Sequence, residues 1–225
     1  MLTDHVSDLL FCPSHAAVRN LAAEGVTHGV HVVGDVMHDV LRRELATLGT
    51  QNPVAASVGC ADGGYVVATI HRPGNTDVPE RFEQIVAAFA SIAADGCPVI
   101  WPAHPRTAAL VGARRFPPGV HVVPPTSYRQ MLALLRGARC ALTDSGGLQK
   151  EAYWVGTPCV TVRPSTEWVE TVEEGWNRLV DADEAAIVGA VAEGGRPSTP
   201  RDAYGDGAAA ARIVALVHAL VSAGR

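Results

Sequence analysis

The sequence predicts an α/β protein built on a doubly wound parallel sheet. Apolar residues make up 48% of the 225 residues and charged residues only 18%, a balance that excludes intrinsic disorder and a coiled coil. From residue 65 to residue 162, short apolar runs rich in β-branched residues alternate with helical patterns. Strands of a parallel sheet are covered by helices on both faces, so they read as continuous apolar runs. The length suffices for one large core.

Short apolar runs bounded by turn residues predict the strands of this sheet. They are Val66–Ile70, Val99–Trp101, Val120–Val123, Cys140–Thr143 and Cys159–Val162. Between them, apolar residues recur at helical spacing in Pro79–Ala94, Ser127–Arg136 and Leu148–Val155. The last of these helices is followed by Gly156 and Pro158, which is typical of a helix end.

The two ends of the chain follow a different pattern. Leu9–Cys12 and Val30–Val33 are predicted strands on either side of a helix, Ser14–Glu24, whose first residue is a suitable N-cap. A unit of this size buries too little surface to stand as a domain, so we interpret it as the tail of another domain. Residues 46–64, rich in Gly, Ala and Ser, are predicted to form a surface loop, and Gly207–Ala223 a final helix.

Charge and composition exclude several classes of function. Acidic residues outnumber basic residues by 23 to 18, which argues against nucleic acid as the main ligand. No apolar run approaches the roughly 20 residues of a membrane span, and the first residues lack the basic and apolar parts of a secretory signal. The sequence therefore predicts a cytoplasmic protein without a nucleic-acid or membrane partner.

The nine histidines and five cysteines do not show the spacing of a metal site or a disulfide framework. The cysteines are widely separated, with no Cys-x-x-Cys pair, and no two histidines fall at His-x-His or His-x-x-x-His spacing. Cys140 and Cys159 lie inside apolar runs and are predicted to be buried. No protein-held metal is expected.

The sharpest local motif runs from Thr143 to Glu151, at the end of a predicted strand and the start of the next helix. Gly146 and Gly147 allow an anion to approach the backbone, and the free N–H groups of a helix start attract phosphate. Ser145 adds a hydroxyl donor, and Glu151 offers an acceptor for a ribose diol. The open alternative is a glycine-rich turn with a structural cap. P-loop and dinucleotide fingerprints are absent from the sequence.

Three further turns after predicted strands carry basic residues. His71 and Arg72 follow the first of these strands, His104 follows the second, and Arg163 follows the last. Because the carboxyl ends of parallel strands meet at one sheet edge, these side chains are expected to converge with the glycine-rich helix start. Such convergence favours an anionic ligand, and a purely structural role for each turn is the alternative.

Taken together, eight short strings in register resemble the non-hydrolysing UDP-N-acetylglucosamine 2-epimerases. They are Thr3-Asp4-His5-Val6-Ser7-Asp8, Val32-Val33-Gly34-Asp35-Val36-Met37, Ala68-Thr69-Ile70-His71-Arg72, His104-Pro105-Arg106, Thr143-Asp144-Ser145-Gly146-Gly147-Leu148-Gln149-Lys150-Glu151-Ala152, Thr166-Glu167-Trp168, Gly175-Trp176-Asn177-Arg178-Leu179-Val180 and Tyr204-Gly205-Asp206-Gly207. Their order and spacing agree from the first residue to the last, so the resemblance covers essentially the whole chain.

The resemblance implies two Rossmann-like domains that face each other across a cleft, as in glycosyltransferases of the GT-B type. This chain corresponds to the C-terminal half of that architecture. Under this interpretation, residues 1–34 are a remnant of the N-terminal domain and residues 35–202 are the C-terminal UDP-binding domain. Residues 203–225 are then a helix that returns toward the N-terminal domain.

The reaction implied by the resemblance inverts C2 of UDP-N-acetylglucosamine to give UDP-N-acetylmannosamine, a step that feeds cell-envelope polysaccharide synthesis. The C2 proton is removed, UDP leaves to give a glycal, and UDP adds back with the proton on the other face. No cofactor is required. The chemistry needs a carboxylate base near C2 and electrostatic stabilisation of the departing diphosphate.

The family's motifs also imply roles for individual residues. His71 is the candidate catalytic residue, which orients and neutralises the diphosphate, because an imidazole beside a dianion favours its protonated form. Arg72 and His104 fall where bacterial members bind a second UDP-N-acetylglucosamine as an activator. The candidate contacts to UDP are Ser145, Gly146, Gly147, Glu151, Thr126, Met131 and Arg163.

The carboxylates thought to act as acid and base belong to the family's N-terminal domain, whose Gly-Thr-Arg-Pro-Glu loop has no match in this sequence. We therefore expect a truncated 2-epimerase, or one subunit of a split enzyme, that binds UDP but does not epimerise alone. Exposed apolar surface then predicts a homodimer or docking to a separate N-terminal half. Two alternatives stay open: half of a glycosyltransferase-like protein, and a non-catalytic UDP-sugar-binding module.

Overall fold

The computed structural model describes residues 2–112, 114–198 and 203–224. They form two compact units, and each is described by itself. The sheet unit is Leu48–Pro200, and the terminal unit is Met1–Thr47 together with Arg201–Arg225. The predicted division after residues 34 and 202 remains a prediction about the domains, and residue 202 lies outside the described residues.

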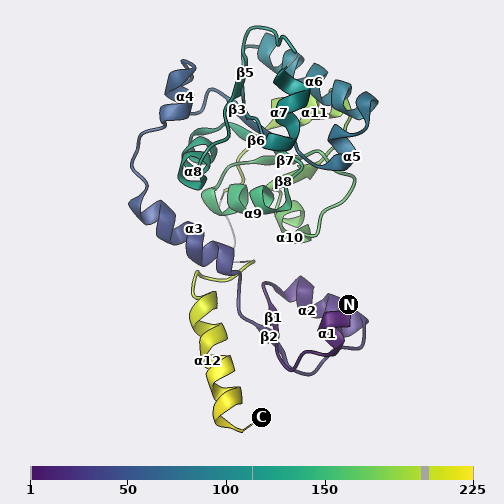
Figure 1. The fold of residues 1–225 in the computed structure, drawn as a ribbon, viewed down its shortest axis with the longest axis vertical. Helices are drawn as coiled ribbons and strands as arrows, with labels where there is room; N and C mark the ends of the chain where they lie inside the picture. The colour runs from purple at the N-terminus through teal and green to yellow at the C-terminus, as the bar shows by residue number, and fades with distance from the viewer. Residues whose placement is uncertain (1, 113, 199–202, 225) are drawn as a thin grey trace. The chain divides into compact units, whose positions relative to one another are not determined.

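The sheet unit contains six parallel strands, which confirms the predicted fold class. Their order is β5-β4-β3-β6-β7-β8, so the chain moves outward in one direction from β3 and in the other from β6 (Figure 1). The bounds are β3 Val66–Thr69, β4 Val99–Pro102, β5 Val120–Val123, β6 Cys140–Thr143, β7 Cys159–Thr161 and β8 Asn177–Leu179. All five predicted strands are present within one residue of their expected bounds. The sixth, β8, escaped prediction because it has three residues, two of them polar.

Helices lie on both faces of this sheet. On one face α6 (Pro79–Ala94) packs against α11 (Glu184–Glu193), and on the other α8 (Tyr128–Gly137) packs against α9 (Gly146–Val155) (Figure 1). The shorter helices are α5 Pro73–Thr76, α7 Pro105–Gly112 and α10 Val169–Glu173. The predicted helices α6, α8 and α9 are therefore confirmed.

The apolar stripe of α6 accounts for much of the core. Phe82, Ile85 and Phe89 recur at helical spacing and are at most 3% exposed. They pack toward Trp101 of β4, which is fully buried, and the Phe89 ring meets the Trp101 ring edge-on with 5.1 Å between centroids. Such edge-to-face pairs stabilise a core beyond the burial of their area. The buried positions predicted for Cys140 and Cys159 are confirmed, and burial raises the pKa of both thiols.

The expectation of a loop over residues 46–64 is wrong in part. This segment contains a short helix, α4 (Pro53–Ser57). Its start is fixed by Asn52, whose side-chain oxygen accepts a hydrogen bond from the Ala55 amide at 3.3 Å, and by Pro53 at the first helical position. Both are helix-start signals, but five residues give no apolar periodicity from which the sequence could have predicted a helix.

The terminal unit is built on a two-stranded parallel sheet. Strands β1 (Leu10–Cys12) and β2 (Val30–Val32) flank α2 (His15–Ala23), and the Ser14 hydroxyl accepts a hydrogen bond from the α2 backbone, as predicted. The unit also contains α1 Leu2–His5, α3 Val36–Thr47 and α12 Ala209–Ser222. The predicted final helix is thus confirmed as α12, within two residues of its expected bounds.

Backbone contacts join the two segments of the terminal unit. The Asp35 amide donates to the Tyr204 carbonyl at 2.9 Å, and the Asp39 carboxylate accepts from the amides of Ala209 and Ala210 at the start of α12. Gly34 has φ +88°, and a Cβ there would lie 2.9 Å from the Tyr204 oxygen. This position therefore requires glycine, both for its backbone angle and for the close approach.

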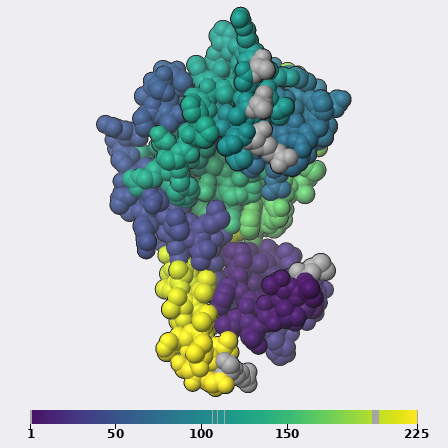
Figure 2. Space-filling model, viewed as in Figure 1, coloured from purple at the N-terminus to yellow at the C-terminus, as the bar shows by residue number. Residues whose placement is uncertain are grey.

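The apolar face of α12 is exposed. Val217 is 41% exposed, Val214 and Val221 are each 67% exposed, and the helix surface is visible in Figure 2 in yellow. None of the helices in the described part of the chain combines the length and apolar character needed to cross a bilayer.

Candidate functional site

The strand order reverses between β3 and β6, and doubly wound sheets bind ligands outside the carboxyl ends of the strands at such a switch point. A cavity of about 260 Å³ lies there. Most of the candidate residues line it, namely His71, His104, Thr126, Met131, Ser145, Gly147 and Glu151. They come from the segments that follow β3, β4, β5 and β6. The predicted convergence at one sheet edge is therefore observed for His71 and His104 but not, at this cavity, for Arg72 and Arg163.

The start of α9 supplies hydrogen-bond donors to this cavity. Ser145 is the N-cap residue, and its hydroxyl lies 3.5 Å from the Leu148 amide. Gly146 and Gly147 are the first two helical residues, so their N–H groups have no acceptor within the helix. The positive end of the helix dipole adds to the attraction for an anion.

Gly146 is tightly enclosed on its outer side. A Cβ at this position would lie 3.2 Å from Trp168 Nε1, 3.7 Å from an Arg72 guanidinium nitrogen and 3.8 Å from a Glu167 carboxylate oxygen. The glycine therefore allows an indole ring, a guanidinium and a carboxylate to approach the helix start. Trp176 packs edge-on against Tyr153, with 6.4 Å between ring centroids.

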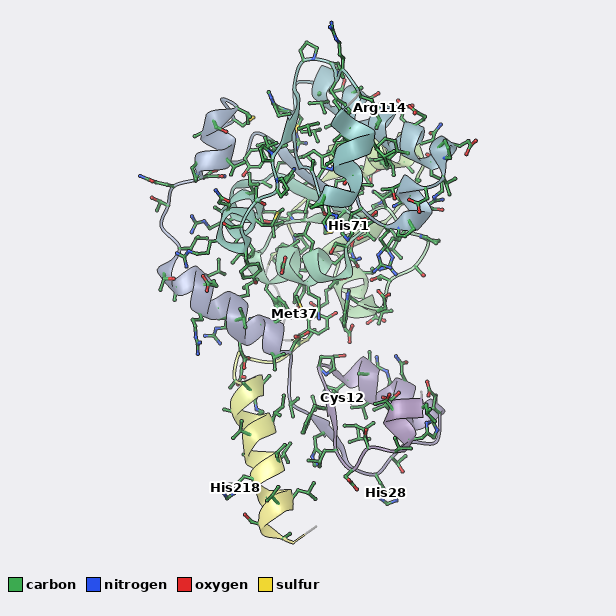
Figure 3. All side chains as sticks on the ribbon, in the orientation of Figure 1. Cys12, His28, Met37, His71, Arg114 and His218 are labelled. Atoms are coloured by element: carbon green, nitrogen blue, oxygen red, sulfur yellow. The ribbon has the colours of Figure 1, made fainter. Side chains whose placement is uncertain are left out.

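His71 is held by Asp144, which is fully buried. The His71 backbone amide donates to both carboxylate oxygens at 3.1 Å, and the imidazole Nδ1 lies 3.4 Å from Oδ1 (His71 is labelled in Figure 3). On its other side the imidazole stacks on His104, with 5.1 Å between ring centroids. Two imidazoles and one carboxylate therefore adjoin the donors at the start of α9.

Glu151 lies one turn into α9 and is only 9% exposed. Burial raises the pKa of its carboxyl, and the nearby Lys150 ammonium offsets part of that rise. Lys150 itself is buried, with its ammonium 3.7 Å from the ring centroid of Trp168 and 5.7 Å from that of Trp154. Cation–π contacts of this kind are stronger when they are shielded from water, so the tryptophans hold a positive charge close to Glu151.

Thr126, in the segment after β5, and Met131, on α8, line the part of the cavity formed on the β3–β4–β5 side of the switch point, whereas α9 follows β6 on the other side. The Thr126 hydroxyl oxygen is buried, and within the described residues it has no hydrogen-bond partner. A buried hydroxyl without a partner is costly, and a polar ligand in the cavity would relieve that cost.

Arg163, Arg72 and Gly146 are not among the residues that line this cavity. Both terminal nitrogens of Arg163 donate to the Glu167 carboxylate, at 2.9 and 2.8 Å. This paired contact lowers the pKa of Glu167 to about 2. Arg163 also lines a second cavity, of about 500 Å³, together with Asp181. For Arg163 to contact UDP, it must either bind the diphosphate while it stays paired with Glu167, or release Glu167 and bind the diphosphate instead.

Several polar residues beneath the site have no role predicted from the sequence. They include Asp144, within the Thr143–Glu151 motif, and Asn75, in the turn after His71. The hydroxyls of Thr69 on β3 and Thr143 on β6 are 2.6 Å apart across the switch point. The signal that could have identified Asp144 is its place directly after an apolar strand, where a carboxylate needs donors to be buried. Within the described residues, no three His, Cys, Asp or Glu side chains are grouped as a metal site requires.

Comparison with known proteins identifies the family. A family model described as UDP-N-acetylglucosamine 2-epimerase matches residues 1–218. A Methanococcus maripaludis protein named UDP-N-acetylglucosamine 2-epimerase homolog is 37% identical over 228 residues, which cover 98% of this chain and 63% of that protein. A Pseudomonas aeruginosa UDP-2,3-diacetamido-2,3-dideoxy-D-glucuronate 2-epimerase is 40% identical over 223 residues, covering 95% and 60% respectively.

The fold agrees with solved structures of these enzymes. The crystal structure of the Methanocaldococcus jannaschii UDP-GlcNAc 2-epimerase in complex with UDP-GlcNAc and UDP superposes with a TM-score of 0.85 at 31% identity, over 96% of this chain and 62% of that chain. The chain thus spans about three fifths of the length of the relatives it matches. The family match over residues 1–218 and the identities above 30% show that this chain belongs to the UDP-N-acetylglucosamine 2-epimerase family.

Proposed function

We propose that this chain provides the nucleotide-binding part of a UDP-sugar 2-epimerase, and that UDP binds in the cavity at the β3–β6 switch point. The observation that carries the proposal is the meeting of three kinds of group in one cavity of about 260 Å³. The start of α9 offers anion-binding amides, His71 offers an imidazole donor, and Glu151 offers a buried acceptor. A nucleoside diphosphate presents the complementary set: two phosphates, and a ribose diol that donates.

In this proposal the diphosphate accepts hydrogen bonds from Ser145, from the amides of Gly146 and Gly147, and from His71. The ribose hydroxyls donate to the Glu151 carboxylate. The uracil then reaches toward Thr126 and Met131, where the buried Thr126 hydroxyl gains a partner, and Arg163 adds positive charge at the edge. Charge-assisted hydrogen bonds of this kind are about twice as strong as neutral ones.

The proposed reaction is inversion at C2 of the sugar by elimination and re-addition. A base takes the C2 proton, the C1–O bond breaks with its electron pair leaving on UDP, and a glycal forms. UDP then attacks C1 again while a proton is delivered to the opposite face of C2. These steps are redox-neutral, so the proposal requires no nicotinamide. The part assigned to this chain is stabilisation of the negative charge that develops on UDP.

Binding of UDP is tested by isothermal titration calorimetry on the folded protein. Ser145→Ala and Glu151→Ala should each weaken binding by about 1–3 kcal/mol, the usual cost of removing a partner from a charged or buried group. Ser91→Ala is the matched control, since Ser91 lies on α6 and donates to Glu184 rather than facing the cavity. A folded protein that shows no heat with millimolar UDP would refute the proposal.

Two substrates are tested against each other, because the Pseudomonas aeruginosa relative at 40% identity is named for a diacetamido-glucuronate sugar. UDP-N-acetylglucosamine is the first candidate. The second sugar carries an additional carboxylate, and the Arg72 guanidinium beside the start of α9 is a group that could bind it. Tighter binding of the glucuronate sugar, lost in Arg72→Ala, would select the second candidate.

Catalysis is tested separately from binding. The chain is incubated with UDP-N-acetylglucosamine in deuterated water, and C2 of the sugar is examined by NMR. Without a carboxylate base near C2 we expect UDP binding and no deuterium incorporation, which is also the outcome for a non-catalytic UDP-sugar-binding module. Adding the N-terminal part of a relative separates the two, because only a 2-epimerase component should then exchange the C2 proton. Incorporation by the chain alone, abolished in His71→Ala, would assign the base to His71.

We also propose that Arg72 and His104 contact a second, activating UDP-N-acetylglucosamine, and that the protein works in the cytoplasm as a homodimer or with a partner that carries the remaining domain. The stacking of His104 on His71 supports a link between the two ligand positions. Exposed apolar side chains on α3 and α12 support association. In an active assembly we expect sigmoidal substrate dependence that becomes hyperbolic in Arg72→Ala. In light scattering we expect a molar mass above that of one chain.

A further inference from the structure

We propose that Asp144 is a positioning residue, and that it fixes the His71 imidazole with Nδ1–H toward its own carboxylate and Nε2 toward the cavity. A line of polar side chains, Asn75, Arg81 and Asp181, holds Asp144 in place from behind. The inference rests on the proposed function only where it predicts an effect on UDP binding. The orientation of His71 can be tested without any ligand.

The contacts of Asp144 define its position. The carboxylate is fully buried and accepts hydrogen bonds from the backbone amides of His71, at 3.1 Å, and Arg72, at 2.9 Å. The same carboxylate lies 3.4 Å from His71 Nδ1. One side chain therefore sets both the backbone and the ring of His71. A carboxylate that faces one ring nitrogen fixes the tautomer and turns the other nitrogen away, as carboxylates do for histidines that bind ligands or metals.

Asn75 links Asp144 to the interior of the sheet unit. Its side-chain nitrogen donates to Asp144 Oδ2 at 3.1 Å and to the Val162 carbonyl at 3.0 Å. Its side-chain oxygen accepts from Arg81 Nε at 3.2 Å and from a terminal Arg81 nitrogen at 2.9 Å. Asn75 is 3% exposed, and these contacts use both its donors and its acceptor. Such a saturated buried amide has one favourable orientation.

Arg81 continues the line to Asp181, with which it forms a hydrogen-bonded ion pair. Asp181 follows β8 and is the one residue other than glycine in the described part of the chain with a positive φ, +52°. A non-glycine residue in this region is strained, so its conformation must be held by the surrounding structure. The hydrogen bond from Arg81 is one contact that holds Asp181, and it lowers the pKa of the Asp181 carboxyl. The edge of the sheet is thus connected through four side chains to the imidazole at the switch point.

Other groups of the described residues also adjoin the His71 ring or its turn. His104 stacks on the imidazole, and the Arg72 backbone amide donates to the same Asp144 carboxylate. Neither of these contacts selects which ring nitrogen carries the proton in the neutral imidazole. The line from Asp144 to Asp181 is the element that makes this selection, and so prepares Nε2 to take a proton and donate it to an anion in the cavity.

The test is the tautomer of His71 in ligand-free protein, read by long-range ¹H–¹⁵N NMR at about pH 8, where histidines of ordinary pKa are neutral. The wild type should show the Nδ1–H form. Asp144→Asn should shift His71 toward the Nε2–H form and, in calorimetry, raise the UDP dissociation constant about tenfold, as expected for loss of a charge-assisted contact. Asp181→Asn keeps a residue that tolerates positive φ and should produce a smaller shift in the same direction. Glu83→Gln, which breaks an exposed ion pair on the same helix as Arg81, should produce none.

Each outcome decides the inference. The proposal is overturned if the wild type shows the Nε2–H form. It is also overturned if Asp144→Asn keeps the wild-type tautomer while its thermal stability falls, because Asp144 then has only a structural role. If Asp144→Asn does not fold, Asp181→Asn decides, and an unchanged tautomer in that variant overturns the proposal. Absence of UDP binding by the wild type would contradict the proposed function but not the inference, because the tautomer shift is measured without ligand.

Discussion

The sheet unit and the terminal unit bury their apolar residues to very different extents. In the sheet unit, every residue of β4, β6 and β7 is buried, and the six strands are covered by helices on both faces. In the terminal unit, none of the three residues of β2 is buried. Most exposed large apolar side chains among the described residues also belong to the terminal unit, including Val36, Val40, Val217 and Val221.

The two units therefore differ in how completely each one covers its own apolar residues. The sheet unit has a contiguous core and its own cavity at the switch point, so its fold and site depend on contacts within residues 48–200. The terminal unit is joined mainly by backbone and cap contacts, such as those of Asp35 and Asp39. Contiguous exposed apolar side chains are typical of surfaces that pack against another protein element.

Hydrogen exchange should give the largest contrast between the two units. Amides of β3 and β6 lie in the centre of a covered sheet and are expected to exchange only through global unfolding. Amides of α12 have few buried contacts, so they should exchange on the order of 10³-fold faster or more. The measurement is mass spectrometry of peptides from Val66–Thr69, Cys140–Thr143 and Ala209–Ser222. Equal protection of α12 and β6 would contradict the comparison.

Two valine-to-alanine substitutions, one in each unit, should change the free energy of unfolding by different amounts. Val67 on β3 is fully buried, whereas Val221 on α12 is 67% exposed. Val67→Ala should lower the free energy of unfolding by about 2 kcal/mol through lost burial and a residual cavity. Val221→Ala should change it by less than about 0.5 kcal/mol, since surface changes are small and alanine favours helix. Urea denaturation followed by circular dichroism measures both. A large loss for Val221→Ala would mean that α12 is covered in solution.

Glu151→Gln should stabilise the sheet unit and weaken UDP binding. Burial raises the pKa of the Glu151 carboxyl, so the ionised form is penalised in the folded protein and stability falls as pH rises through that pKa. At pH 7 the variant should therefore melt about 2 °C higher than the wild type and bind UDP more weakly. The gain in melting temperature should vanish below the ordinary pKa of 4.5, where the carboxyl is neutral in both states. A variant that melts lower at pH 7 would show that ionised Glu151 is stabilised by Lys150.

The smallest expected effect concerns the Arg163–Glu167 pair. The hydrogen bonds from Arg163 lower the pKa of Glu167 to about 2, so the stability they provide is present above pH 4.5 and is lost as pH falls toward 2. Because the Glu167 side chain is 56% exposed, solvent screening limits this contribution to less than about 1 kcal/mol. Glu167→Gln should accordingly reduce stability slightly at pH 6 and not at pH 2. A carboxyl of Glu167 that titrates near 4.5 in NMR would exclude the pair in solution.

Several parts of the site could be predicted from local sequence, and others could not. The Ser145 cap and the glycines after β6 form a contiguous motif, and their position follows from a strand that ends and a helix that begins. His71, His104 and Thr126 follow separate strands, and their convergence follows from the rule that parallel strands end at one edge. Their roles toward UDP remain predictions. The two-residue error on α12 and the missed β8 both occur where apolar periodicity is weak.

The sequence by itself determined the α/β class, five of the six strands of the sheet and the resemblance to the 2-epimerases, because each depends on the order of residues along the chain. Tertiary structure alone decided what surrounds His71. Asp144 lies 73 positions from His71 and Asp181 lies 100 positions from Arg81, and no local pattern encodes such a pairing. The stacking of His71 on His104 and the contact of Lys150 with Trp168 have the same origin, whereas Trp154 lies four residues from Lys150 on the same helix. Hydrogen bonds and ring contacts depend on distances of a few ångström in space, and only the folded sheet brings these side chains that close.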